Sequence, residues 1–286
     1  MATQRPFDGK VAIVTGSSRS FGAVIARHLA AKGANIVVNF ASDSSKEKAQ
    51  KVAQELQSEY GVKAVPAQAD LATIDGPKKL IEIARSHFIN PEGRFQIDII
   101  VNNAGVCNPE ALEGLTAEMY DGAFNINARG PALLVSAAMP YLPNDRSGRI
   151  VNISSIGASV GLMYSTAYAG SKGALEAMTR VWARELAERA TVNSVSVGCM
   201  AGTGLYDCIP KEMSHVVFPL LSNAPLSAVR PGVDSDEVVE AAKDLGGRPA
   251  YVDEAAAVVS MICGSESAWM TGSCISATGG GVMTRS

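Results

Sequence analysis

The sequence predicts an α/β protein in which a doubly wound parallel sheet carries helices on both faces. Three observations support this prediction. Short apolar runs alternate with longer amphipathic stretches from residue 10 to residue 277. The runs are continuous rather than alternating, which is typical of strands buried on both faces of a parallel sheet. Parallel neighbours need crossover connections, and right-handed crossovers through helices build a doubly wound sheet.

The expected elements of the first half follow in regular order. A strand at residues 10–15 precedes a helix at 20–32, where Gly33 supplies the residue that a helix end favours. A strand at 35–40, a helix at 44–60 and a strand at 62–67 come next. The helix at 77–88 begins with Pro77, whose missing N–H costs nothing in a first turn. A buried strand at 97–101 ends this half.

The second half continues with one long helix and one poorly patterned segment. The long helix is expected at residues 116–139 and stops near Pro140. Strands are expected at 149–153, 191–197 and 274–277, and helices at 165–189 and 254–263. Residues 202–249 contain several prolines and no clear period. We interpret them as a mobile substrate lid, and the alternative is an idle surface insertion.

Length and composition are those of one large globular domain spanning residues 1–286. The chain is 47% hydrophobic and 19% charged, enough for a single large core. A net charge of −3 argues against nucleic acid as a partner. No apolar run reaches the ~18 residues that cross a bilayer, and the N-terminus lacks a secretory apolar region. Five cysteines without a CxxC pair and three scattered histidines predict a cytoplasmic protein with reduced thiols and no metal site.

The turn from Thr15 to Gly22 (TGSSRSFG) joins the first expected strand to the first expected helix. Backbone N–H groups and a helix N-terminus attract phosphate, and glycines let the chain approach it closely. The spacing is TGxxxGxG with Ser20 at the middle glycine. A glycine-only backbone conformation at Ser20 would cost about 1–3 kcal/mol. The turn predicts a dinucleotide site whose affinity depends on that serine.

The end of the second expected strand bears on the choice of cofactor. NAD enzymes usually carry a carboxylate there for the ribose 2′-hydroxyl, whereas this chain has Asn39. No negative charge at this position repels a 2′-phosphate, and Arg19 could neutralise one. Asp43 argues slightly the other way, and Arg19 could be only a solvated loop residue. We therefore expect NADPH to be preferred over NADH.

Tyr168 and Lys172 lie four residues apart and therefore share one face of an expected helix. An ammonium beside a phenol favours its ionised form and could bring a pKa of about 10 towards neutrality. Such a pair by itself is usually a solvated surface pair. The phosphate turn and Ser155, thirteen residues before Tyr168, favour a catalytic pair instead.

Four motifs stand in order: the TGxxxGxG-like turn, Asn102-Asn103-Ala104-Gly105, Ser155 and Tyr168-x-x-x-Lys172. Over nearly the whole chain they resemble the short-chain dehydrogenase/reductase family, and most of all fungal NADPH-dependent reductases of hydroxynaphthalene, steroid and polyketide-type ketones. The resemblance implies a Rossmann-type sheet of order 3-2-1-4-5-6-7. It also implies a small-molecule substrate, no membrane partner, and a homotetramer or homodimer that pairs its long helices.

The resemblance assigns catalytic roles. Tyr168 is the general acid of reduction, and Lys172 favours the tyrosinate and binds the nicotinamide ribose. Ser155 holds the substrate oxygen, and Asn127 anchors a water of the proton relay. Ser154 and Asn125 are the rivals of Ser155 and Asn127. The thirteen-residue separation favours Ser155, and the Ala-Arg-Gly that follows favours Asn127.

The resemblance also assigns cofactor contacts. Asp70 accepts from the adenine amino group, and residues 103–105 line the adenosine ribose, whereas Asn102 could serve only the sheet end. After the sixth strand Val197 replaces a proline and Thr203 comes one residue late, so Thr203 is a candidate only. The full set is Gly16, Ser18, Arg19, Ser20, Phe21, Gly22, Asn39, Ser42, Asp70, Leu71, Asn103, Ala104, Gly105, Tyr168, Lys172, Gly198 and Thr203.

The expected substrate pocket comes from residues 106–108, 159–164 and 202–221. Its side chains are mostly apolar or aromatic, with no arginine cluster to grip a phosphate or carboxylate. This favours a neutral, bulky hydrophobic or aromatic ketone of the secondary-metabolite type. The alternatives are a 3-oxoacyl thioester reductase, an alcohol dehydrogenase that works oxidatively, and a non-catalytic NADPH sensor.

Overall fold

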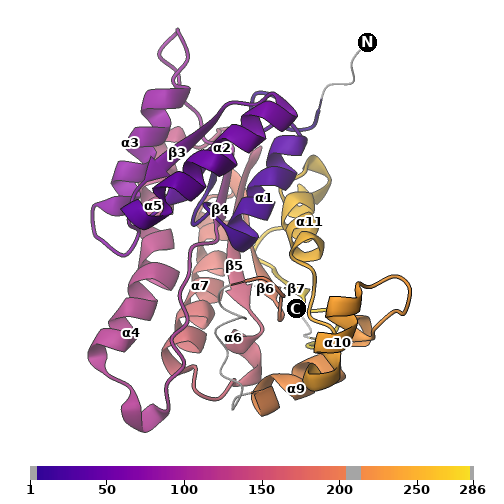
Figure 1. Ribbon diagram of the computed structural model, residues 1–286. Helices are drawn as coiled ribbons and strands as arrows, with labels where there is room; N and C mark the ends of the chain where they lie inside the picture. The colour runs from indigo at the N-terminus through magenta and orange to yellow at the C-terminus, as the bar shows by residue number, and fades with distance from the viewer. Residues whose placement is uncertain (1–4, 204–213, 284–286) are drawn as a thin grey trace.

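The computed structural model describes residues 5–203 and 214–283, which form a parallel sheet between two layers of helices (Figure 1). The sheet order is β3-β2-β1-β4-β5-β6-β7, and every neighbouring pair is parallel. This confirms the predicted Rossmann-type sheet. The strands are β1 Val11–Val14, β2 Asn35–Phe40, β3 Ala64–Gln68, β4 Ile99–Asn102, β5 Gly148–Ser155, β6 Ala190–Val197 and β7 Cys274–Ala277.

Helices connect the strands and cover both faces of the sheet. The first six are α1 Ser20–Ala31, α2 Lys46–Tyr60, α3 Gly76–Phe88, α4 Ala117–Phe124, α5 Gly130–Ala138 and α6 Gly157–Val160. The others are α7 Thr166–Glu185, α9 Ser214–Ser222, α10 Asp236–Leu245 and α11 Val252–Ile262. The predicted elements agree with these bounds within a few residues, apart from the two segments described below. None of the described helices is long and apolar enough to span a membrane.

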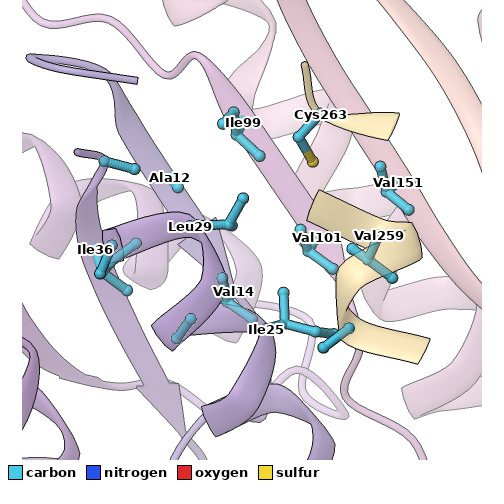
Figure 2. Close-up of a cluster of buried hydrophobic side chains, with 14 of the residues drawn as sticks. Ala12, Val14, Ile25, Leu29, Ile36, Ile99, Val101, Val151, Val259 and Cys263 are labelled. Carbon is cyan, nitrogen blue, oxygen red and sulfur yellow. The ribbon is translucent and has the colours of Figure 1, made fainter. Parts of the chain in front are cut away.

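Each strand of the sheet centre buries both of its faces, as its unbroken apolar run predicted. In β1, Ala12 and Val14 join one hydrophobic cluster while Val11 and Ile13 join the other. The first cluster packs α1, α2 and α11 against the sheet, and the second packs α3, α5 and α7. Figure 2 shows the first cluster, with Ile25 and Leu29 of α1 and Val259 of α11 against strand side chains.

The helix predicted at residues 116–139 is interrupted. Between α4 and α5, residues Asn125–Arg129 form a π-helical turn, and Met139–Tyr141 form a 3₁₀ turn after α5. Pro131 lies in the first turn of α5 and has no N–H for the carbonyl four residues earlier. The wider turn accommodates that lost bond, and such turns are frequent at functional sites.

The segment predicted to lack pattern contains two helices, α9 and α10, in its described part. Figure 1 shows them beside each other near the β7 edge, far from α2 and α3. The Ser235 side chain caps α10 by accepting from the N–H of Val238, and Gly246 ends it at φ +76°. Ser and Gly at these positions are ordinary helix signals that the sequence analysis missed. Residues 204–213 of the predicted lid lie outside the described residues.

Candidate active site

The turn after β1 is shaped by close backbone approach. Gly16 adopts φ +62°, and a Cβ there would lie 3.0 Å from the Ala104 Cα. A Cβ on Gly22 would lie 2.4 Å from the Gly16 carbonyl oxygen. Asn103 Nδ2 donates to the Thr15 carbonyl at 2.8 Å. Asn103 and Ala104 therefore bind the turn itself, and glycine is required where the two loops meet.

The N-terminus of α1 fits the phosphate that the turn predicts. Arg19 is the N-cap residue, and its side chain makes no capping hydrogen bond. The first turn of α1 contains no acidic residue, and Arg19 is exposed. The first N–H groups of a helix lack internal partners and carry partial positive charge. These features give the turn and α1 the donors that a dinucleotide pyrophosphate needs.

The side chain of Asn39, at the end of β2, makes its hydrogen bonds to other residues of the protein. Its Oδ1 accepts from the Gly16 N–H at 3.1 Å, and its Nδ2 donates to the carbonyls of Ala67 and Ala69 at 3.2 and 3.0 Å. The side chain is 2% exposed. Asn39 therefore holds the turn after β1. Its predicted role in cofactor choice is only that no carboxylate stands at this position to repel a 2′-phosphate. Sequence reasoning missed that it holds the turn.

The neighbours of Asn39 are also engaged locally. Asp43 accepts from Gln68 Nε2 at 3.0 Å, and Ser42 Oγ bonds Ser44 Oγ at 2.8 Å. Asp70 is exposed and accepts from the Ala72 N–H at 2.9 Å, whereas Leu71 is buried. Asn102 is buried and donates to Asn152 Oδ1 at 2.7 Å, so its role at the sheet end is confirmed.

Ser155, Tyr168 and Lys172 gather where β5 ends and α7 begins. Lys172 is 3% exposed, and its Nζ donates to the Ile153 carbonyl at 2.7 Å and lies 5.9 Å from the centre of the Tyr168 ring. A Cβ on Gly157 would lie 3.4 Å from Ser155 Oγ and 3.6 Å from Tyr168 Cε1. The three predicted catalytic side chains are therefore neighbours.

The two rival serines face opposite ways, because successive strand residues alternate. Ser155 Oγ and the Tyr168 ring both lie beside Gly157, whereas Ser154 Oγ donates to Glu176 Oε1 at 2.5 Å. The preference for Ser155 as the substrate-side serine agrees with this geometry.

The titration of the tyrosine and the lysine follows from burial. Burial raises the pKa of Tyr168 to about 12, and the hydrogen bond with Ser155 opposes that rise. Burial also lowers the pKa of Lys172 to about 8. The expectation that Lys172 brings the phenol towards neutrality is therefore not met by the protein alone. At neutral pH Tyr168 carries its proton.

Two thiols lie near this pair and are protonated at neutral pH. Burial raises the pKa of Cys107 and of Cys199 to about 11 each. Neither is therefore a ready nucleophile. In residues 5–203 and 214–283 the cysteines are free thiols, and no group of three His, Cys, Asp or Glu side chains could hold a metal ion. Cys208 is outside these ranges.

Asn127 occupies the π-helical turn and is fully buried. Its Nδ2 donates to the Val106 carbonyl at 2.9 Å and to Ser171 Oγ at 3.0 Å, and its Oδ1 accepts from the Val106 N–H at 2.9 Å. The amide thus joins the loop after β4 to α7. A Cβ on Gly105 would lie 3.1 Å from Asn127 Oδ1 and 3.4 Å from Lys172 Nζ.

The loop after β6 contacts the phosphate turn through Ser20. Ser20 has the left-handed φ of +53° that glycine favours, and its Oγ donates to the Gly202 carbonyl at 3.1 Å. Thr203 is buried and donates to the Met200 carbonyl at 2.9 Å, and the Gly198 N–H donates to Ala277. The serine that departs from the glycine pattern therefore joins two loops, a link that the sequence did not reveal.

Comparison with known proteins gives matches over most of the chain. The family model for short chain dehydrogenases matches residues 10–213. L-xylo-3-hexulose reductase of Hypocrea jecorina is 44% identical, over 96% of this chain and 97% of its own length. A probable tetrahydroxynaphthalene reductase of Zymoseptoria tritici is 35% identical, over 96% of each. The crystal structure of the angucycline C-6 ketoreductase LanV with bound NADP superposes with a TM-score of 0.79 at 30% identity, over 96% of this chain and 95% of its own.

Proposed function

The chain belongs to the short-chain dehydrogenase family, and from that premise we propose that it is an NADPH-dependent ketone reductase. The observation that carries the proposal is the joint placement of Ser155, Tyr168 and Lys172, with Gly157 beside the first two and Gly105 beside the lysine. The solved neighbour with bound NADP supports the choice of cofactor. So do the exposed Arg19 and the absence of a carboxylate at residue 39.

When bound, NADPH supplies the hydride that adds to the carbonyl carbon. The turn after β1 and the N-terminus of α1 would hold its pyrophosphate, and Arg19 would pair with its 2′-phosphate. Ser155 donates a hydrogen bond that orients the substrate carbonyl oxygen. Tyr168 gives its proton to that oxygen as negative charge develops, and the charged Lys172 stabilises the tyrosinate left behind.

The protonated Tyr168 fits the acid role that ketone reduction needs. A phenol with a pKa of about 12 is protonated at pH 7 and acts as an acid. To act as the base of alcohol oxidation it would first have to lose that proton. Tyr168→Phe removes the proton and leaves the ring, so it also separates a reductase from an NADPH sensor.

Two substrate classes have support. Leu162, Met163 and Tyr164 lie just before α7, and Met163 is 56% exposed, which favours the bulky hydrophobic or aromatic ketone. The tetrahydroxynaphthalene reductase relative fits the same class. The second class is a ketose, and it is favoured by the 44% identity to a protein named L-xylo-3-hexulose reductase.

The test measures kcat/KM with NADPH for 2-tetralone and for L-xylulose, using wild-type protein and Tyr168→Phe. We expect turnover of at least one ketone, and a loss of 100-fold or more in Tyr168→Phe with the Kd for NADPH within about twofold. Equal turnover by the variant would refute the catalytic assignment. Tight NADPH binding without turnover of any ketone would favour the sensor.

Assembly and location complete the proposal. We infer a homotetramer or homodimer, supported by the exposed apolar side chains of α4 and α7, where Tyr120 and Val181 are 42% and 51% exposed. We also infer a cytoplasmic location, supported by the free thiols of the described residues.

A further inference from the structure

A third ionisable residue lies on α7 in line with the catalytic pair. Glu176 follows Lys172 by four residues, as Lys172 follows Tyr168. Side chains at this spacing share one face of a helix, with Cβ atoms about 5–6 Å apart. Glu176 is half-buried, and its Oε1 accepts the 2.5 Å hydrogen bond from Ser154 Oγ. Glu176 therefore connects α7 to strand β5 one turn beyond the catalytic lysine.

We propose that Glu176 is a positioning residue that keeps Lys172 charged and ties α7 to β5 directly behind Ser155. The proposal rests on the ketone-reductase function, in which a charged Lys172 stabilises the tyrosinate. Glu176 acts through Lys172 and Ser154, without touching the substrate.

The electrostatic part of the argument concerns a buried cation. Burial alone disfavours the charged lysine and lowers its pKa, and the nearby charges that oppose this fall belong to Cys107 and Glu176. The Cys107 thiol has a pKa of about 11 and is neutral at pH 7. Among the described residues, Glu176 is therefore the carboxyl group that opposes the effect of burial on the lysine.

Within the part of the chain that the structure describes, the other groups that face Lys172 add no anion at neutral pH. The phenol of Tyr168 is protonated, and β5 offers only the carbonyl of Ile153 and the hydroxyl of Ser155. The π-helical turn contributes the amide oxygen of Asn127. On the loop after β6, Cys199 is a neutral thiol that acts on Tyr168.

The geometric part of the argument is that strand β5 holds the carboxylate by a short hydrogen bond. Ser154 of β5 donates to it at 2.5 Å, and the Cys274 thiol of β7 interacts with it electrostatically. Arg180, one turn further along α7, acts electrostatically on that same thiol. Because Ser154 precedes Ser155 directly, a fixed Ser154 also fixes the backbone that presents Ser155. Orientation and charge can thus be removed separately, by Ser154→Ala and by Glu176→Gln.

The test reads the charge of Lys172 directly and does not require turnover. The protein is labelled with ¹⁵N-lysine, and the Nζ resonance of Lys172 is assigned by its absence in Lys172→Arg. We expect its titration midpoint to fall by about one pH unit in Glu176→Gln, and to stay near the wild-type value in Glu176→Asp and Ser154→Ala. An unchanged midpoint in Glu176→Gln overturns the proposal.

A kinetic readout then separates positioning from stability. The alkaline limb of the pH profile of kcat/KM should move to lower pH in Glu176→Gln, with a loss of about tenfold above pH 8 and little loss at pH 6.5. Glu176→Asp should recover most of this loss. A uniform loss at every pH would indicate a structural role and would contradict the proposal. If even the wild-type protein reduces no ketone, the proposed function fails while the ¹⁵N titration still decides the role of Glu176.

Discussion

Arg19 is the residue on which the cofactor preference depends most directly. It is the N-cap residue of α1, its side chain is exposed, and the first turn of the helix contains no acidic residue. A charge-assisted bond to a 2′-phosphate is worth about 1.5–3 kcal/mol, so Arg19→Gln should raise the Kd for NADPH at least tenfold. The Kd for NADH should change less than twofold. Both constants are measured by quenching of protein fluorescence.

The control for this prediction is Arg27→Gln on the same helix. Arg27 pairs with Glu55 at 3.2 Å, and losing that surface pair should leave both Kd values unchanged. Equal weakening of NADPH and NADH binding in Arg19→Gln would show that the arginine does not select the 2′-phosphate.

Ser20 has an unfavourable backbone conformation, and its side chain makes a hydrogen bond between two loops. Its φ of +53° is strained for any residue with a Cβ, whereas its hydroxyl joins Gly202. Ser20→Ala keeps the strain and loses the bond, while Ser20→Gly loses both. We expect the Tm of the glycine variant to exceed that of the alanine variant by about 2–4 °C, the equivalent of about 1 kcal/mol. Equal Tm values in a thermal melt would mean that the turn relaxes.

At the scale of elements, the sequence predicted regular helices better than interrupted ones. The turn at Asn125–Arg129 was missed because the expected helix was ended only near Pro140, although the missing N–H of Pro131 already disrupts the turn before it. The helices α9 and α10 were missed because the prolines and the missing period of residues 202–249 indicated a loop, and the capping residues of α10 were not considered. Proline and capping residues locate such elements only when the backbone donors and acceptors of each turn are followed one by one.

Asp234 fastens the segment before α10 to the start of α11. Its side chain is shielded from solvent, bonds Arg230 at 2.7 Å and Tyr251 Oη at 3.3 Å, and lies 3.7 Å from Arg248 Nε. Chiefly through its bond with Arg230, the pKa of Asp234 is lowered to about 2. We expect Asp234→Asn to lower the Tm by roughly 5 °C at pH 7, because two arginines lose their shared carboxylate.

The pH dependence of this effect has a definite sign. A carboxyl whose folded pKa is depressed stabilises the fold fully above its unfolded pKa of about 4. That contribution is lost as pH falls through about 2, so the difference between wild type and Asp234→Asn should shrink from pH 5 to pH 2. Glu240→Gln, which removes a surface partner of Lys243, is the control and should stay near wild type. A difference that stays constant down to pH 2 would contradict the ionic explanation.

At the scale of the whole molecule, the sheet could be predicted because the burial of each strand is visible in the residues of that strand. Continuous apolar runs appear where both faces are covered, so the existence of each strand and the parallel class followed directly. The motif residues Ser155, Tyr168 and Lys172 lie together because Ser155 ends β5, the other two lie on α7, and β5 and α7 are neighbours. The commitments of Asn39, Ser20 and Glu176 could not be read in advance. Each of them makes a side-chain hydrogen bond to a residue distant in the chain: Asn39 to Gly16, Ser20 to Gly202 and Glu176 to Ser154.

Assembly is the prediction that belongs to the whole molecule. Helices α4 and α7 pack together and leave Tyr120 and Val181 exposed on their outer faces. Apolar groups on paired helices favour association with a second copy, which removes them from water. Light scattering should therefore give two or four times the chain mass of 29.8 kDa. Val181→Glu should shift the protein to a smaller species, whereas Ile74→Glu, at a 64% exposed side chain before α3, should not. A monomeric wild-type protein at micromolar concentration would refute the pairing of these helices.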